Sequence, residues 1–141
     1  MNGSTIFEKV EKDIAEYGWH VISVACPDSP DFSYSVGFEK TLDHPEVIMS
    51  GLDMKLMHQL LNDIAELIKK GDSFGDGDFS DEVVSGFSVK FVSVEASVLE
   101  EYLAVAKGHY QGKYFRALQC LWPDKNGMFQ TESSEVQEFL G

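Results

Sequence analysis

The fold is decided by two alternating stretches, WHVISVA at residues 19–25 and FSYSVGF at residues 32–38. In each stretch successive side chains point to opposite faces of an extended chain, which is the pattern of a β-strand. The residues between them, CPDSPD at 26–31, are rich in proline and aspartate and predict a turn. We therefore predict a hairpin over residues 19–38.

Apolar residues before this hairpin recur at helical spacing. Ile6, Val10 and Ile14 fall on one face of a helix. The helix is predicted to open at a capping box, in which Thr5 caps and Glu8 reaches back, and to end at Gly18.

Helical and strand patterns continue to alternate after the hairpin. Two further helices are predicted, over about residues 54–70, capped by Asp53, and 98–110. Strands are predicted over residues 46–50, 87–94 and 115–122, with a solvated loop at 71–82, a short returning strand at 128–131 and a helical turn at 134–140. The order mixes hairpins with crossovers. It predicts a single α+β domain over residues 1–141, with about three helices on a mixed, mostly antiparallel sheet.

The charge balance restricts the classes of partner. The 141 residues include 24 Asp and Glu but only 11 Lys and Arg, which gives a net charge of −13. Nucleic acids and anionic lipid headgroups both attract basic side chains, so we expect neither as a partner. A basic protein is the partner that complementary charge favours. The same charge also keeps a protein soluble whatever it binds.

Cysteine usage and hydropathy indicate a cytoplasmic protein. Cys26 and Cys120 are too few for a disulfide or zinc framework, and Cys120 is expected to be a buried thiol. No apolar run approaches the roughly 20 residues of a membrane helix, and the polar N-terminus is unlike a signal peptide. We therefore expect the cytoplasm, where thiols stay reduced. No metal-ligand or catalytic spacing is evident, so we predict no metal, no cofactor and no catalytic residue.

Several short segments carry a family resemblance over about residues 10–129. They are Gly18-Trp19, FSYSVG at 32–37, HPEV at 44–47, Gly51-Leu52, LLN at 60–62, Tyr110, Phe115, Gln119, and LWPD at 121–124 followed by Gly127 and Phe129. In this order and spacing the chain resembles domain of unknown function 4262. The chain departs from the family pattern at Gln130 and after Gln137, where the family commonly has proline. The resemblance implies no activity, because the family is named for lacking one.

The acidic residues between 71 and 101 are the predicted binding site for a basic protein. We predict that this site includes Asp72, Asp76, Asp78, Asp81 and Glu82, with Glu95, Glu100 and Glu101 as neighbours. Bacterial immunity proteins that block nuclease toxins share this profile of small size, acidity and no catalytic motif. Calcium binding by the same aspartates is less favoured, because the closing glutamate of an EF-hand loop is missing.

A ligand pocket is the alternative prediction. Tyr34, His44, Glu46 and Trp122 lie near the expected ends of strands, where pockets tend to form. His44 is the strongest candidate among the histidines, because it lies in a loop between two strands. This alternative, a small-ligand-binding protein or an enzyme, requires the four side chains to converge.

Overall fold

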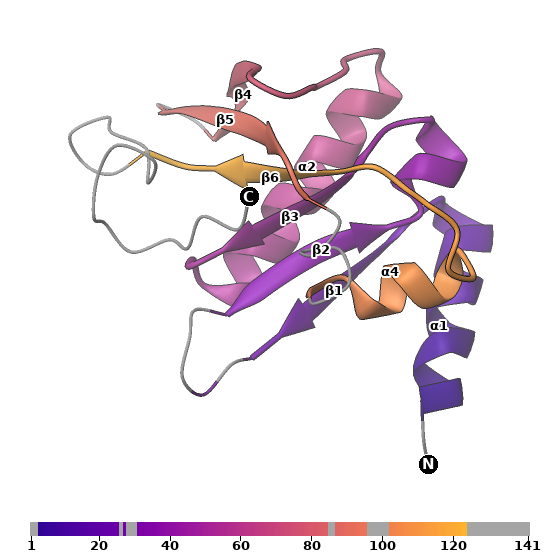
Figure 1. The fold of residues 1–141 in the computed structure, drawn as a ribbon. Coiled ribbons are helices and arrows are strands. Elements are labelled where there is room, and N and C mark those ends of the chain that lie inside the picture. Colours follow the sequence, from indigo (N-terminus) through magenta and orange to yellow (C-terminus); the bar gives the residue numbers. More distant parts are fainter. Residues whose placement is uncertain (1–2, 26, 28–30, 85–86, 96–101, 124–141) are drawn as a thin grey trace.

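The described residues form one mixed sheet with helices on both faces (Figure 1). The computed structural model describes residues 3–25, 27, 31–84, 87–95 and 102–123. The strands are β1 (His20–Val24), β2 (Phe32–Val36), β3 (Glu46–Ser50), β4 (Phe79–Val84), β5 (Phe87–Ser93) and β6 (Ala117–Leu121). The helices are α1 (Gly3–Tyr17), α2 (Met54–Lys69) and α4 (Ala104–His109), with a single π-helical turn, η1 (Phe38–Leu42).

The sheet has the strand order β1-β2-β3-β6-β5-β4. β3 and β6 run parallel and every other neighbouring pair is antiparallel. The predicted hairpin is confirmed: β1 pairs with β2 so that His20 lies opposite Val36 and Val24 opposite Phe32. The α+β class and the mostly antiparallel sheet are therefore confirmed as well.

The sheet separates two cores. On the central strand β3, Val47 and Met49 face the core covered by α2, whereas Ile48 faces the core covered by α1 and α4. This alternation follows from the two-residue period of a strand. Burying each of these side chains contributes roughly 1.5–3 kcal/mol relative to leaving it exposed. The whole of β3 is buried because helices cover it on both faces.

The predicted second helix is confirmed. The Asp53 side chain accepts hydrogen bonds from the backbone N–H groups of Lys55 (3.0 Å) and Leu56 (3.3 Å), which satisfies two donors at the start of α2. The helix buries one stripe, comprising Met57, Leu60, Leu61, Ile64, Ala65 and Ile68. These buried residues recur every three or four positions, as the apolar residues of the sequence predict for one face of a helix.

The predicted loop at 71–82 is wrong in part, because β4 begins at Phe79. Pairing with β5 starts even earlier: Gly77 N–H donates to Phe91 O (2.7 Å) and Phe91 N–H donates to Asp78 O (2.8 Å). The acidic, glycine-rich composition of this segment is typical of a loop and gives no sign of a strand. The predicted helix at 98–110 is helical over Ala104–His109, and residues 96–101 and the predicted elements after residue 124 lie outside the described residues.

Gly37 is required where β2 turns into η1. Its φ of 113° is in the region that favours glycine, and a Cβ would lie 2.7 Å from Gly18 O and 3.1 Å from Trp19 Cα. Both are backbone atoms that side-chain rotation cannot move. We therefore expect Gly37→Ala to lower the free energy of unfolding, measured by urea denaturation, by about 3 kcal/mol.

Gly71→Ala is the matched control for this substitution. Gly71 has a similar φ of 117°, but nothing lies within 4 Å of the position that a Cβ would occupy there. Gly71→Ala should therefore lower the free energy of unfolding by about 1 kcal/mol, the cost of holding an alanine at positive φ. Equal losses for the two variants would show that the close approach to Gly18 does not matter.

Candidate functional site

An acidic hollow lies beside strand β4. It has a volume of about 420 Å³, and its acidic lining consists of Asp72, Asp78, Asp81 and Glu82. We call this site the acidic hollow. Phe74, Phe79 and three serines complete its lining, which includes no Lys or Arg among the described residues. Four like charges around one concavity produce a negative potential that attracts cationic groups.

Three contacts hold the segment that carries Asp72 and Asp78 in place. Phe74 stacks on Phe91 with ring centroids 4.5 Å apart, and the Phe74 N–H donates to His44 Nε2 (3.0 Å). Asp78 Oδ2 accepts a hydrogen bond from Gly75 N–H (2.7 Å). The segment before β4 is therefore anchored to the core, and the acidic side chains are presented from a fixed backbone.

The hollow also presents an aromatic side chain. Phe79 is 59% exposed on β4, which forms one edge of the sheet. The ammonium of Lys90, on the neighbouring strand, lies 5.5 Å from the centroid of its ring. An exposed ring among carboxylates provides apolar contact area beside charge, and aromatic residues are enriched in protein interfaces.

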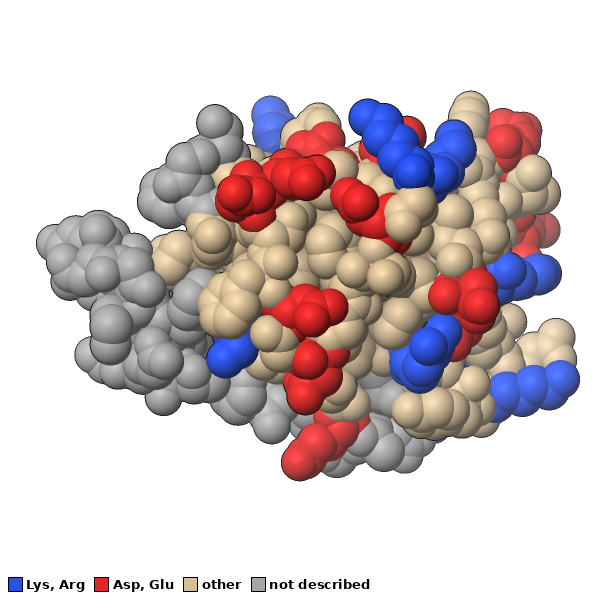
Figure 2. Space-filling view, turned by 90° about the horizontal axis from the view of Figure 1, so that it is seen from above, with Lys and Arg blue, Asp and Glu red and all other residues tan. Residues whose placement is uncertain are grey.

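The other acidic residues of the predicted partner site lie elsewhere. Asp76 lines a different hollow with Tyr114 and Arg116, and its Oδ1 accepts a hydrogen bond from Ser93 N–H (2.7 Å). Glu95 is exposed just after β5, and Glu100 and Glu101 lie outside the described residues. Figure 2 shows Asp and Glu side chains in several groups on the face seen from above, with Lys and Arg between them.

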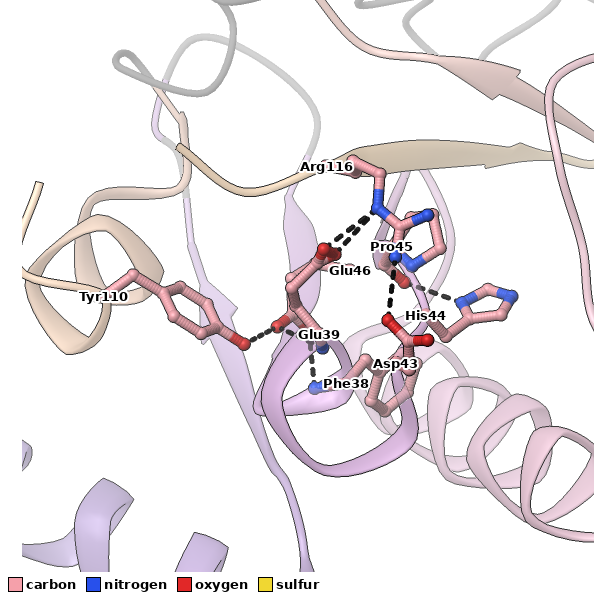
Figure 3. A network of polar contacts seen from close by, with 8 residues as sticks. All are labelled: Phe38, Glu39, Asp43, His44, Pro45, Glu46, Tyr110 and Arg116. Carbon is pink, nitrogen blue, oxygen red and sulfur yellow. Dashed lines mark hydrogen bonds and ion pairs between the residues drawn. The ribbon is translucent and has the colours of Figure 1, made fainter. Parts of the chain in front are cut away.

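A buried carboxylate lies at the start of β3 (Figure 3). Glu46 is fully buried, and five donors converge on its two oxygens. Its Oε1 accepts from Ser35 Oγ (2.6 Å) and Phe38 N–H (3.1 Å). Its Oε2 accepts from Gly37 N–H (3.0 Å), Glu39 N–H (3.2 Å) and the Tyr110 hydroxyl. Glu46 thus joins β2, η1 and the end of α4.

Burial controls the ionisation of this network. Removal from water raises the pKa of Glu46 above its ordinary value, and the hydrogen bonds from Ser35, Tyr110 and the backbone oppose that shift. Burial and the adjacent carboxylate raise the pKa of Tyr110. Glu46 is buried, and both of its carboxylate oxygens accept hydrogen bonds. The network therefore links β2, η1 and the end of α4 inside the protein.

His44 is buried in its neutral form. Its Nε2 accepts from Phe74 N–H, so Nδ1 carries the proton and donates to Pro45 O (2.8 Å). Burial lowers the pKa of His44 below its ordinary value. The unfolded chain therefore binds a proton at a higher pH than the folded chain, and stability falls as the pH drops below the unfolded pKa of about 6.5.

We accordingly expect the wild type to lose more unfolding free energy than His44→Gln between about pH 7.5 and about pH 5.5. A glutamine oxygen can accept the Phe74 hydrogen bond but does not titrate. Urea denaturation at the two pH values measures the difference. Parallel losses in both proteins would contradict this role for His44.

The structure does not bring the four residues of the predicted pocket together. The Tyr34 hydroxyl accepts from Val105 N–H (3.1 Å) in the core under α1 and α4, and burial raises its pKa to about 12. Trp122 packs against the opposite core, under α2, and donates from Nε1 to Ser50 O (3.1 Å). Tyr34, His44 and Glu46 are each at most 3% exposed. Tyr34 and Trp122 are therefore separated by the sheet.

Other features of the described residues concern metals, thiols and membranes. No group of three or more His, Cys, Asp or Glu side chains among these residues is arranged to hold a metal ion. Cys120 is buried, as predicted, and burial raises the pKa of its thiol. Within the same residues, no helix combines the length and the apolar character needed to cross a membrane.

The sequence predicts the acidic residues of the hollow as part of a partner site, but neither of its two aromatic residues, Phe74 and Phe79. Both lie in the segment 71–82, which the sequence predicts to be a solvated loop. Two phenylalanines in one acidic segment are the available signal, because aromatic rings bury large apolar areas, and Phe74 does stack on Phe91.

Comparison with known proteins identifies the family. Neither the search of curated proteins nor the search of solved structures finds a match for this chain. A family model, described as Domain of unknown function (DUF4262), matches residues 13–134, which is most of the chain. The resemblance seen in the sequence is thus confirmed, and the protein belongs to the DUF4262 family.

Proposed function

We propose that the protein binds a basic protein partner and neutralises it, as an immunity protein neutralises a bacterial toxin such as a nuclease. One observation carries this proposal: four acidic side chains from the 72–82 segment line one hollow around an exposed phenylalanine. A nuclease needs a cationic surface to bind its substrate. The acidic hollow has the complementary charge, and the cytoplasm is the compartment in which such an inhibitor would act.

Charge and the aromatic ring would have separate roles in this interaction. The net charge of −13 would speed association by attracting a cationic partner from a distance. Close contacts between partner Lys or Arg groups and the lining carboxylates would then fix the register. Phe79 would supply apolar contact area and slow dissociation. No step of this function requires catalysis by the protein.

Capture from a lysate of the native host tests the proposal. The immobilised protein should retain one predominant basic protein at low salt, with recovery falling at about 0.5 M salt because exposed charge contacts are screened. Asp78→Asn should reduce the recovery, whereas Asp43→Asn should not, because Asp43 is fully exposed outside the hollow. Recovery of acidic proteins only, or of none, would overturn the proposal.

A further inference from the structure

A second hollow lies at the opposite edge of the sheet. It has a volume of about 530 Å³ where α1 and α2 flank the edge strand β1. We call it the α1–α2 groove, and the residues that define it here are Asp13, Tyr17, Trp19, His20, Asn62 and Lys69. Its volume falls in the range of sites for small molecules, roughly 300–1,000 Å³.

One pair of residues fixes a hydrogen-bond acceptor in the groove. Gly18, with φ of 102°, turns the chain from α1 into β1 and brings Asp13 next to His20. Asp13 Oδ2 lies 2.6 Å from His20 Nδ1, and Lys9 Nζ lies 3.5 Å from the same oxygen. An ionised carboxylate only accepts, so Nδ1 donates to Asp13, and a ring that carries this single proton offers Nε2 as an acceptor.

A second pair fixes donors beside an aromatic ring. Trp19 Nε1–H donates to Asn62 Oδ1 (2.9 Å), which fixes the orientation of the amide and leaves its Nδ2 group as a donor. The ammonium of Lys69 lies 5.9 Å from the centroid of the Trp19 ring. The indole of Trp19 is therefore bordered by an amide donor and a cationic donor, both from α2.

We propose that the α1–α2 groove binds a small monocarboxylic acid that carries a hydroxyl group and an aromatic body. The carboxylate would accept from Asn62 Nδ2 and Lys69 Nζ, the two donors beside the indole. The hydroxyl would donate to His20 Nε2, and the aromatic body would pack against Trp19 and the exposed Tyr17.

The charges around the groove favour one negative charge over two. Lys9 and Lys69 line the groove together with Asp13, Glu16 and Glu66. Lys9 is already paired with Asp13. Glu16 and Glu66 repel any anion, but they repel a dianionic phosphate about twice as strongly as a single carboxylate, for which Lys69 is the available cation. The groove lies apart from the acidic hollow, so this inference does not depend on the proposed function.

Mandelate is the probe for this site, with two analogues that each lack one of its polar groups. Phenylacetate lacks the hydroxyl, and 1-phenylethanol lacks the carboxylate. In an NMR titration of the full chain, mandelate should shift the Trp19 indole N–H and the Asn62 side-chain amide. We expect each analogue to bind about tenfold more weakly, because a site built around polar groups rejects ligands that leave them unpaired.

Asn62→Asp keeps an oxygen for Trp19 but replaces the amide donor with a negative charge. It should weaken mandelate binding by at least about tenfold. Lys55→Gln is the matched control, since it changes the charge of α2 by the same amount and Lys55 does not line the groove. Retained mandelate binding in Asn62→Asp, equal binding of all three probes, or no shift at Trp19 would overturn the proposal. An unchanged urea denaturation midpoint confirms that Asn62→Asp remains folded.

Discussion

Glu46→Gln is expected to lower the free energy of unfolding by about 3 kcal/mol. Five donors converge on the two carboxylate oxygens of Glu46, and three of these donors are backbone N–H groups that cannot reorient. A glutamine has one oxygen and one amino group. Each oxygen position of Glu46 is faced by at least one backbone N–H, so either orientation of the amide places a donor against a donor.

Glu39→Gln is the control for this substitution. Glu39 pairs with Arg116 at 2.9 Å, but the side chains of Arg116 and Glu39 are 47% and 23% exposed, so water reaches the pair. Its loss should cost less than about 1 kcal/mol. Urea denaturation at neutral pH measures both variants. If Glu46→Gln also costs less than about 1 kcal/mol, the buried carboxylate is not the connection between β2, η1 and α4 that we describe.

Neutralising the acidic hollow is expected to weaken binding of the basic partner about 100-fold. The variant replaces Asp72, Asp78 and Asp81 with Asn and Glu82 with Gln. The Asp78→Asn change keeps a side-chain oxygen for Gly75 N–H, and Asp76, whose carboxylate accepts from Ser93 N–H, stays unchanged. The backbone of the segment should therefore keep its position. The loss should come from slower association, because these exposed charges steer the encounter, and from faster dissociation, because the lining carboxylates contact the partner directly.

The control variant makes the same charge change away from the hollow. It replaces Glu8, Glu16 and Glu66 with Gln and Asp43 with Asn, all of them exposed and none of them in the lining of the acidic hollow. Surface plasmon resonance at one fixed salt concentration compares the two variants. The control should bind within about fivefold of the wild type, because distant charges contribute only screened, long-range attraction. Equal losses would mean that net charge, and not the hollow, governs binding.

Local patterns in the sequence predict most of the described elements. The alternation in residues 19–38 predicts the β1–β2 hairpin, and Asp53 marks the start of α2. These predictions succeed because caps and periodicity act over a few neighbouring residues. Local patterns do not predict β4, because nothing in its own few residues marks it as a strand. Its acidic side chains are exposed, and its strand conformation depends on pairing with β5, which composition does not reveal.

The candidate sites depend on residues that are distant in sequence. Tyr110 reaches Glu46 across 64 positions, and Trp19 reaches Asn62 across 43. No local pattern encodes such contacts, because they depend on how helices and strands pack. Charge was more informative: a count of carboxylates predicted the segment that lines the acidic hollow. That count does not distinguish Asp76, which accepts a hydrogen bond from Ser93 N–H, from Asp78, which lines the hollow.

NMR can locate the surface through which the protein contacts its basic partner in solution. Backbone amide shifts of the protein would be recorded with increasing amounts of the captured basic partner. We expect the largest shifts to cluster at Asp72, Asp78, Phe79, Asp81 and Glu82, which line the acidic hollow. Shifts that cluster in the α1–α2 groove, or that spread evenly over the acidic surface, would contradict this expectation.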